Sequence, residues 1–365
     1  MVPHLDSPTG ERSLDEHAGA TPFREREAPP PMTPAPSLPT EERRMRALPT
    51  PVTIERLLVP LDGTPYAERA VPYVAALAAA AGASVTLAHV RMHLALPSIA
   101  HLNEVVQSLV NTKPDISVSD FPTYLQWTRH WLTKYVHDVD IDQIDAPSVV
   151  SGLSEIGRRW QTSITVIASH TRQGAGRLIL GSVADGLVHE GGAPVLVIPP
   201  LVSGSAQWVP SPVRVLVPLD GSELAEQALG PVIGWADGGP LAEVMPREVA
   251  LVTIAPHWGA LPHAERYVRA TAERLAARLP LAHITAHATV GETASALVEL
   301  ADSGLSGRDG VLPPADLIVM ATHGRGGLGR WLYGSVAAHV LPRVRVPVLL
   351  VHPRERTAAA PRYDA

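Results

Sequence analysis

An eight-residue stretch that occurs twice decides the fold: LLVPLDGT at residues 57–64 and VLVPLDGS at residues 215–222. Four further blocks recur after it in the same order: AERA at 67–70 and AEQA at 225–228, ITVIASH at 164–170 and LIVMATH at 317–323, GSVA at 181–184 and 334–337, and PVLVI at 194–198 and PVLLV at 347–351. The chain is therefore a tandem duplication of a unit of about 145 residues.

Each unit alternates short apolar runs with helical patterns. In the second unit we expect strands at 213–219, 248–254, 283–290, 316–321 and 347–352, and helices at 223–235, 262–279, 293–301 and 335–341. Continuous apolar runs indicate strands that are covered on both faces, and strand–helix alternation indicates right-handed parallel crossovers. We therefore predict an α/β protein with two tandem doubly wound domains, each a Rossmann-like five-stranded parallel sheet.

The first unit follows the same order, although residues 94–144 resist assignment. Residues 70–88 carry no charge, but their alanines, Pro72 and Gly82 indicate a buried helix end, a glycine cap and a buried strand rather than a membrane span.

Composition shifts suggest the domain boundaries. Residues 1–50 are rich in proline and charge and predict a disordered tail, with a Pro-rich partner motif as the alternative. We then expect a first domain at 51–200, a linker at 201–212, a second domain at 213–353 and a short tail at 354–365.

Composition also excludes several functional classes. The 365 residues carry a net charge of −6 and no cysteine, which argues against a dedicated nucleic-acid binder, disulfide staples, thiolate catalysis and Cys-ligated metals. The first 16 residues are charged throughout and lack the apolar core of a secretory signal. We expect a cytoplasmic protein without a membrane partner.

The repeated motifs gather where ligands bind in open parallel sheets, beyond the carboxyl ends of the strands. In the second unit the first strand ends in PLDGS at 218–222 and the fourth in MATHGRGG at 320–327. We expect Ser335 to cap the next helix and leave the amides of Val336 and Ala337 free for an anion. Arg325 and Arg330 add positive charge, and Asp220 is placed for a ribose hydroxyl or Mg²⁺. The alternative reading is an ordinary turn and an ordinary cap.

Both units resemble universal stress protein domains over roughly residues 53–352. That family's adenine-nucleotide motif is Gly, two residues, Gly, nine residues, then Gly-Ser or Gly-Thr. In the second unit Gly324, Gly334 and Ser335 match, and Ala321 stands at the first glycine. The family's aspartate after the first strand matches Asp220 and Asp62. Its turn after the third strand matches 289–292, with no clean equivalent near 144–146.

The resemblance implies that the second domain binds ATP or AMP, with or without Mg²⁺. The base would rest near Pro218, Leu219, Ile254 and Met320, and Asp220 would meet the ribose or metal. The whole implied site comprises Pro218, Leu219, Asp220, Ile254, Met320, Ala321, His323, Gly324, Arg325, Gly334, Ser335 and Val336. A weaker first-domain site comprises Pro60, Asp62, Ala168, Gly181, Ser182 and Val183.

The two sites should differ in affinity. In the first unit Gly181 and Ser182 match the motif, but Ala168 and Thr171 replace both earlier glycines. If the loop requires positive φ there, a β-branched residue is strained by roughly 1–2 kcal/mol, and its side chain intrudes on the phosphates. We therefore expect tighter binding in the second domain.

Other motifs carry less weight. The GxGxxG pattern at 324–329 follows the fourth strand and lacks a later acidic residue, so we do not read it as a dinucleotide fingerprint. Neither a P-loop nor a GxSxG elbow occurs. His283 with His287, and His89 with His93, lack a third compactly spaced ligand.

Three classes of function remain. They are a nucleotide-binding stress regulator, a ligand-free scaffold that acts through a pseudo-dimer surface, and an adenylyl transferase or synthetase. The enzyme reading lacks HxGH and SGGxDS, so we expect at most slow ATP hydrolysis. The apolar final strands at 194–198 and 347–351 should pair as an intrachain pseudo-dimer, since exposed edges invite aggregation. Homodimerisation stays open.

Overall fold

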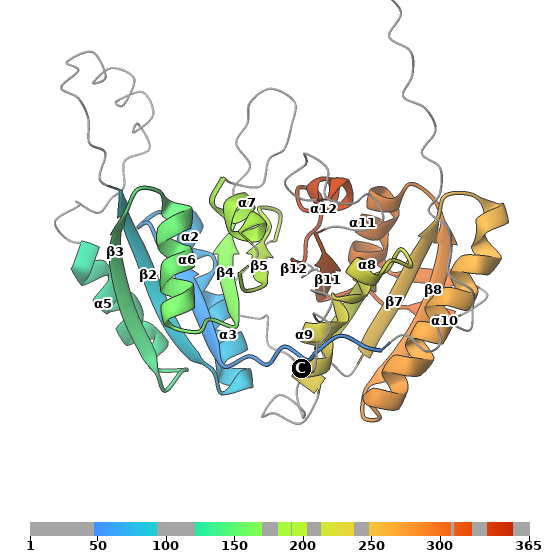
Figure 1. The fold of residues 1–365 in the computed structure, drawn as a ribbon, viewed down its shortest axis with the longest axis horizontal. Helices are drawn as coiled ribbons and strands as arrows, with labels where there is room; N and C mark the ends of the chain where they lie inside the picture. Colours follow the sequence, from blue (N-terminus) through green and yellow to red (C-terminus); the bar gives the residue numbers. More distant parts are fainter. Residues whose placement is uncertain are drawn as a thin grey trace, which may run out of the picture. The chain divides into compact units, whose positions relative to one another are not determined.

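Two successive halves of the chain repeat one order of elements (Figure 1). The computed structural model describes residues 47–92, 121–169, 182–190, 192–202, 213–236, 248–307, 310–322 and 334–352. We call residues 47–202 the first half and residues 213–352 the second half. All described residues belong to one compact unit.

The first half contains five strands and five helices among its described residues: β1 (Arg56–Pro60), α2 (Pro65–Glu68), α3 (Val71–Ala81), β2 (Ser84–Met92), α5 (Phe121–Leu132), β3 (Val139–Ala146), α6 (Val149–Arg159), β4 (Ile164–Ala168), α7 (Ser182–His189) and β5 (Val195–Ile198).

The second half repeats this order and adds a hairpin, β9–β10. Its described elements are β6 (Arg214–Pro218), α8 (Glu223–Glu226), α9 (Leu229–Ala236), β7 (Glu248–Ala255), the 3₁₀ helix η3 (Trp258–Ala260), α10 (Leu261–Arg278), β8 (His283–Val290), α11 (Thr293–Ser303), β9 (Leu305–Gly307), β10 (Gly310–Leu312), β11 (Leu317–Ala321), α12 (Ser335–Val340) and β12 (Val348–Val351).

Ten strands from the described residues form one sheet, in the order β3-β2-β1-β4-β5-β12-β11-β6-β7-β8. Within each half every neighbouring pair is parallel. The chain moves outward from β1 to β3 and then returns to the other side of β1, which makes each half doubly wound. The predicted fold class, two tandem Rossmann-like five-stranded domains, is confirmed.

The last strands of the halves pair with each other. β5 and β12 are antiparallel, with Leu196 opposite Leu349. This pairing is what the predicted pseudo-dimer requires, while the pseudo-twofold arrangement itself stays a proposal.

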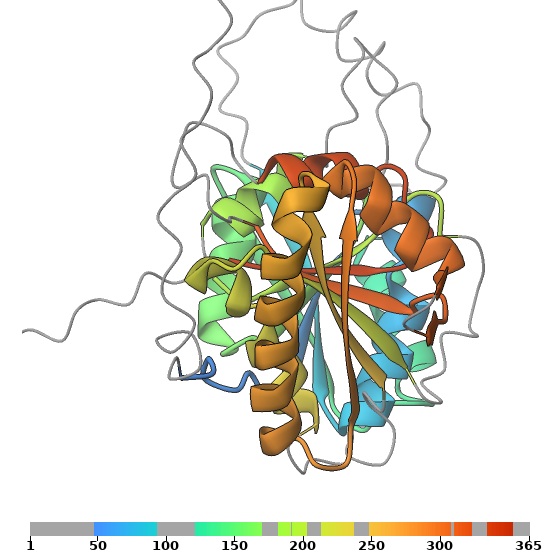
Figure 2. The same cartoon turned by 90° about the vertical axis from the view of Figure 1, so that its right-hand side faces the viewer.

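The core lies on both faces of the sheet. Leu57 and Leu58 are neighbours in β1, are 0% and 1% exposed, and belong to different hydrophobic clusters. The cluster around Leu57 takes side chains from α3, α5, α9 and α10, and the cluster around Leu58 takes them from α6, α7, α11 and α12. Figure 2 shows α10 packed across β7 and β8. Small aliphatic side chains on two faces explain the continuous apolar runs of the strands.

The structure departs from the sequence expectations in three places. The helix expected at 223–235 is two helices, α8 and α9, separated by a turn at 227–228. The segment that resisted assignment supplies α5 and β3, while residues 93–120 lie outside the described residues. The expected tail extended to residue 50, but Leu48 packs against the Leu57 cluster. Most of the tails and linker lie outside the described residues.

The uncharged stretch at 70–88 forms α3, a cap at Gly82 and the start of β2, as predicted. In the part of the chain that the structure describes, no helix is both long and apolar enough to cross a bilayer.

Candidate functional site

The described residues of the predicted second-half site lie at the ends of β6, β7 and β11 and at the start of α12, and β6 and β11 are adjacent strands. Their register pairs Val215 with Leu317 and Leu216 with Ile318. Residues 218–220 leave the carboxyl end of β6 and residues 321–322 leave that of β11, at the same edge of the sheet. Ile254 lies near the end of the next strand, β7. This is the switch point in strand order, where parallel sheets bind ligands.

The turn after the first strand is the same in both halves. Gly221 has φ +87° and Gly63 has φ +77°, a backbone that residues with a Cβ adopt at a cost. The Asp220 Oδ1 accepts a hydrogen bond of 2.9 Å from the Ser222 amide, and the Asp62 Oδ1 accepts one of 2.9 Å from the Thr64 amide. One oxygen of each aspartate therefore holds the turn in place.

The loop between β11 and α12 begins and ends at one point. The Gly334 amide donates to the Thr322 carbonyl. A Cβ added at Gly334 would lie 2.4 Å from that oxygen, so only glycine allows this approach. The predicted site residues His323, Gly324 and Arg325 lie outside the described residues.

The predicted cap of α12 was wrong by one residue. Gly334 is the N-cap, which has no side chain to cap the helix, and Ser335 is the first helical residue. The Ala338 amide donates to the Gly334 carbonyl at 3.1 Å. In a helix the amides before that bond have no partner four residues earlier within the helix, and in α12 these are the amides of Ser335, Val336 and Ala337.

The apolar residues of the predicted site divide by burial. Leu219 and Met320 are 3% and 5% exposed, and Met320 packs within the Leu58 cluster. The Leu219 amide donates to the Val252 carbonyl at 2.8 Å. Pro218, Ile254 and Ala321 are partly exposed. Val336 is partly exposed as well, so these four residues can present side-chain surface to a ligand.

The first-half site is described in part. Pro60, Asp62 and Ala168 lie at the matching strand ends, and Ser182 and Val183 begin α7. Gly181 and Thr171 lie outside the described residues.

Sequence analysis missed an acidic residue in the first turn of α7. The Oδ1 of Asp185 is buried without a hydrogen-bond partner among the described residues, and burial raises the pKa of this carboxyl. Counted from Ser182 and Ser335, the matching residue of α12 is Ala338. A carboxylate at this end of a helix disfavours a second anion there.

Two aromatic rings, neither of them among the predicted site residues, cover the turn of the first half. The His89 and Phe121 rings stack at 3.8 Å between centroids, and the His89 Nδ1 lies 2.9 Å from the Leu61 carbonyl oxygen. A Cβ at Gly63 would lie 3.0 Å from the Phe121 ring. Burial lowers the pKa of His89. In the second half Thr253 holds the place of His89, because Leu61 bonds to Ala88 as Leu219 bonds to Val252.

A buried acidic group lies in α8, the short helix that follows the second-half turn. Glu226 is 3% exposed; its Oε2 lies 3.0 Å from the Arg274 Nη2, and the Tyr267 hydroxyl donates to its Oε1 at 3.1 Å. Burial, followed by the charge of Glu226, raises the pKa of Tyr267. The glutamate that the repeat aligns with it, Glu68, is exposed.

The turn after the third strand has an equivalent in the first half after all. Glu292 caps α11 by accepting from the amides of Ala294 and Ser295, and Ser148 caps α6 by accepting from the Ser151 amide. Hydrogen bonds from Ser295 and then Ala294 lower the pKa of Glu292 to about 2. The sequence signal was the N-cap serine, which follows a proline rather than a glycine.

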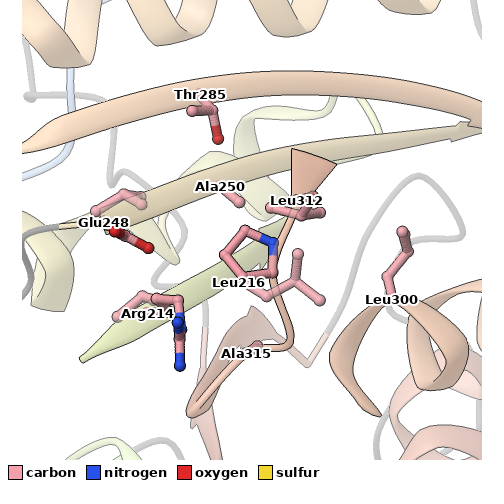
Figure 3. A pocket seen from close by; sticks show the side chains of 11 residues that line it. Arg214, Leu216, Glu248, Ala250, Thr285, Leu300, Leu312 and Ala315 are labelled. Atoms are coloured by element: carbon pink, nitrogen blue, oxygen red, sulfur yellow. The ribbon is translucent and has the colours of Figure 1, made fainter. Parts of the chain in front are cut away.

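A cavity of about 30 Å³ lies at the opposite end of the strands (Figure 3). Arg214 and Glu248, the first residues of β6 and β7, line it together with Leu300 and Leu312. Such a volume holds one or two waters and no nucleotide. Among the described residues no three histidine or acidic side chains gather as a metal site.

The sequence matches the model of the universal stress protein family over residues 53–199 and again over 213–352, which together exceed half of the chain. The chain belongs to the universal stress protein family. A universal stress protein of Mycobacterium tuberculosis is 31% identical over 197 residues, 52% of this chain. The match spans 62% of that relative's own length.

Solved structures agree on the fold. A universal stress protein from Archaeoglobus fulgidus aligns with 81% of this chain and 98% of its own, at 17% identity and a TM-score of 0.55. A universal stress protein solved in complex with cAMP aligns with 40% of this chain and 96% of its own, at 16% identity. Its TM-score of 0.30 is too low to carry an inference about the ligand of this chain.

Proposed function

We propose that this chain is an adenine-nucleotide-binding stress regulator that binds ATP or AMP at the β6–β11 crossover of its second half. The observation that carries the proposal is the contact between Thr322 and Gly334. It brings Thr322, at the end of β11, against Gly334, at the start of α12, and these two residues flank the segment 323–333 that carries the predicted phosphate motif. Family membership and the spacing of Gly324, Gly334 and Ser335 support the same site.

The described residues fit a nucleotide in three respects. Backbone amides at the start of α12 suit phosphate oxygens, and this helix start lies against Thr322 at the end of β11. The partly exposed Pro218, Ile254 and Ala321 offer apolar surface to a base. Asp220, which the family resemblance assigns to ribose or Mg²⁺, follows the carboxyl end of β6, and the phosphates themselves would supply the remaining metal ligands.

The first half is proposed as a degenerate copy. Thr171 stands where Gly324 stands, Asp185 adds an acid to the helix start, and Phe121 covers Gly63. A domain with these features contributes packing and surface. We propose that the halves act as an intrachain pseudo-dimer through β5 and β12, within a cytoplasmic protein that does not bind nucleic acid.

We propose no efficient catalysis. General base catalysis needs a carboxylate or imidazole within reach of the attacking group, and the Oδ1 of Asp220 is already engaged by Ser222. Bound nucleotide would instead change the conformation of the protein or its choice of binding partner.

Equilibrium dialysis of the full chain with labelled ATP tests the proposal, with released pyrophosphate and ADP measured in parallel. We expect saturable binding with negligible product, and co-purified nucleotide in the fresh protein. Absence of saturable binding would favour the alternative, a ligand-free scaffold that acts through a pseudo-dimer surface. The pairing of β5 with β12 is the observation that supports this alternative. Rapid pyrophosphate release would favour an adenylyl-transferring enzyme.

A further inference from the structure

The residues before β1 run across to the second half. Figure 1 shows them as the blue trace that passes α9. The Val52 amide donates to the Gly230 carbonyl at 3.0 Å, and Leu48 and Ile54 contribute to the Leu57 cluster. The chain therefore touches α9 of the second half before it enters the first strand of the first half.

Two glycines of α9 make this approach possible. A Cβ at Gly234 would lie 2.1 Å from the Val52 carbonyl oxygen, and a Cβ at Gly230 would lie 2.8 Å from the Thr50 carbonyl oxygen. Residues four apart share one face of a helix. The backbone of residues 50–52 therefore lies in a shallow groove whose floor is free of side chains.

Two glycines within one short helix lower the stability of that helix, so we looked for a contact that requires them. Glycine within a helix is less favourable than alanine by about 1 kcal/mol, and α9 has only eight residues. The corresponding positions of α3, counted from Asp62 and Asp220, are Pro72 and Ala76. The glycines are therefore a feature of the second half alone.

We propose that the Gly230–Gly234 face of α9 is a docking groove for residues 48–54 of the same chain, which act as a clasp between the halves. The occupant is a segment without regular secondary structure, and its backbone donates the Val52 hydrogen bond to α9. The clasp fastens the start of the first half to the second half independently of the β5–β12 pairing. This proposal does not depend on nucleotide binding.

Hydrogen exchange of the full chain tests the groove, with Gly234→Ala compared against Gly157→Ala. A Cβ at Gly157 has its nearest neighbours at 3.8–3.9 Å, so alanine fits there. We expect the Val52 amide to be protected in the wild type, to exchange at least roughly tenfold faster in Gly234→Ala, and to be unchanged in Gly157→Ala. A Val52 amide that exchanges like unstructured backbone in the wild type, or one that Gly234→Ala leaves protected, would overturn the clasp.

A disulfide supplies a second measurement that does not require Gly234→Ala to fold. The chain contains no cysteine, and a Cβ at Gly230 would lie 4.0 Å from the Pro49 Cβ, within the range of disulfides. After mild oxidation, the double variant Pro49→Cys, Gly230→Cys should lose its free thiols and remain a single chain on a non-reducing gel. Retained thiols, or a disulfide-linked dimer in which the segment docks on a second copy, would contradict the proposal.

Discussion

The two halves have the same turn after the first strand, but they differ in sequence between the fourth strand and the end of the first turn of the helix that follows it. Asp62-Gly63 and Asp220-Gly221 share positive φ and the same aspartate hydrogen bond. The later segments carry Thr171 and Asp185 in one half and Gly324 and Ala338 in the other. Because both halves keep the turn after the first strand, that turn does not distinguish a half that binds a ligand from one that does not. The residues that follow the fourth strand differ between the halves, so they are the better guide to ligand binding.

The largest expected difference between the halves concerns their aligned glutamates. Glu226→Ala removes the buried carboxylate that pairs with the partly exposed Arg274, which should lower the free energy of unfolding by about 3 kcal/mol. Glu68→Ala should cost less than about 1 kcal/mol, because Glu68 is exposed. Urea unfolding of both variants measures the two values. Equal losses would show that the buried group is not specific to the second half.

Replacing the turn glycines should lower the free energy of unfolding by less than Glu226→Ala does. Alanine at φ +77° or +87° should lower the free energy of unfolding by about 1–2 kcal/mol in either half. Gly63→Ala should be the more harmful, since its Cβ would also press on Phe121 at 3.0 Å. Thermal unfolding of Gly63→Ala and Gly221→Ala compares them, and a neutral Gly221→Ala would mean that the shared turn has little structural value.

The smallest expected difference is in how the stability contributed by the two helix caps after the third strands depends on pH. The pKa of Glu292 is lowered from 4.5 to about 2, so its stabilisation is present above about 4.5 and is lost as the pH falls towards 2. Glu292→Ala should therefore destabilise the protein at neutral pH but hardly at all in strong acid. Ser148→Ala removes an uncharged cap, so its cost should not follow that titration. Unfolding midpoints of both variants across this pH range test the contrast, and parallel curves would refute it.

The repeat made the fold predictable, because five matching blocks fix the strands and the loops that bear motifs. The strand ends of the site followed from the same repeat, with an error of one residue at Ser335, since Gly334 approaches Thr322 too closely for any other residue to cap α12. Contacts between distant segments could not be read from local patterns. The His89–Phe121 stack, the partners of Glu226 and the docking of Val52 on α9 each join residues whose spacing carries no periodic signal.

The central claim is that this chain binds one adenine nucleotide, in its second half. Titration calorimetry of the full chain with ATP tests it directly, in the wild type, Gly324→Val and Thr171→Gly. We expect one site per chain, a loss of affinity of about tenfold or more in Gly324→Val, and unchanged or stronger binding in Thr171→Gly. Two equal sites in the wild type, or full binding by Gly324→Val, would contradict it.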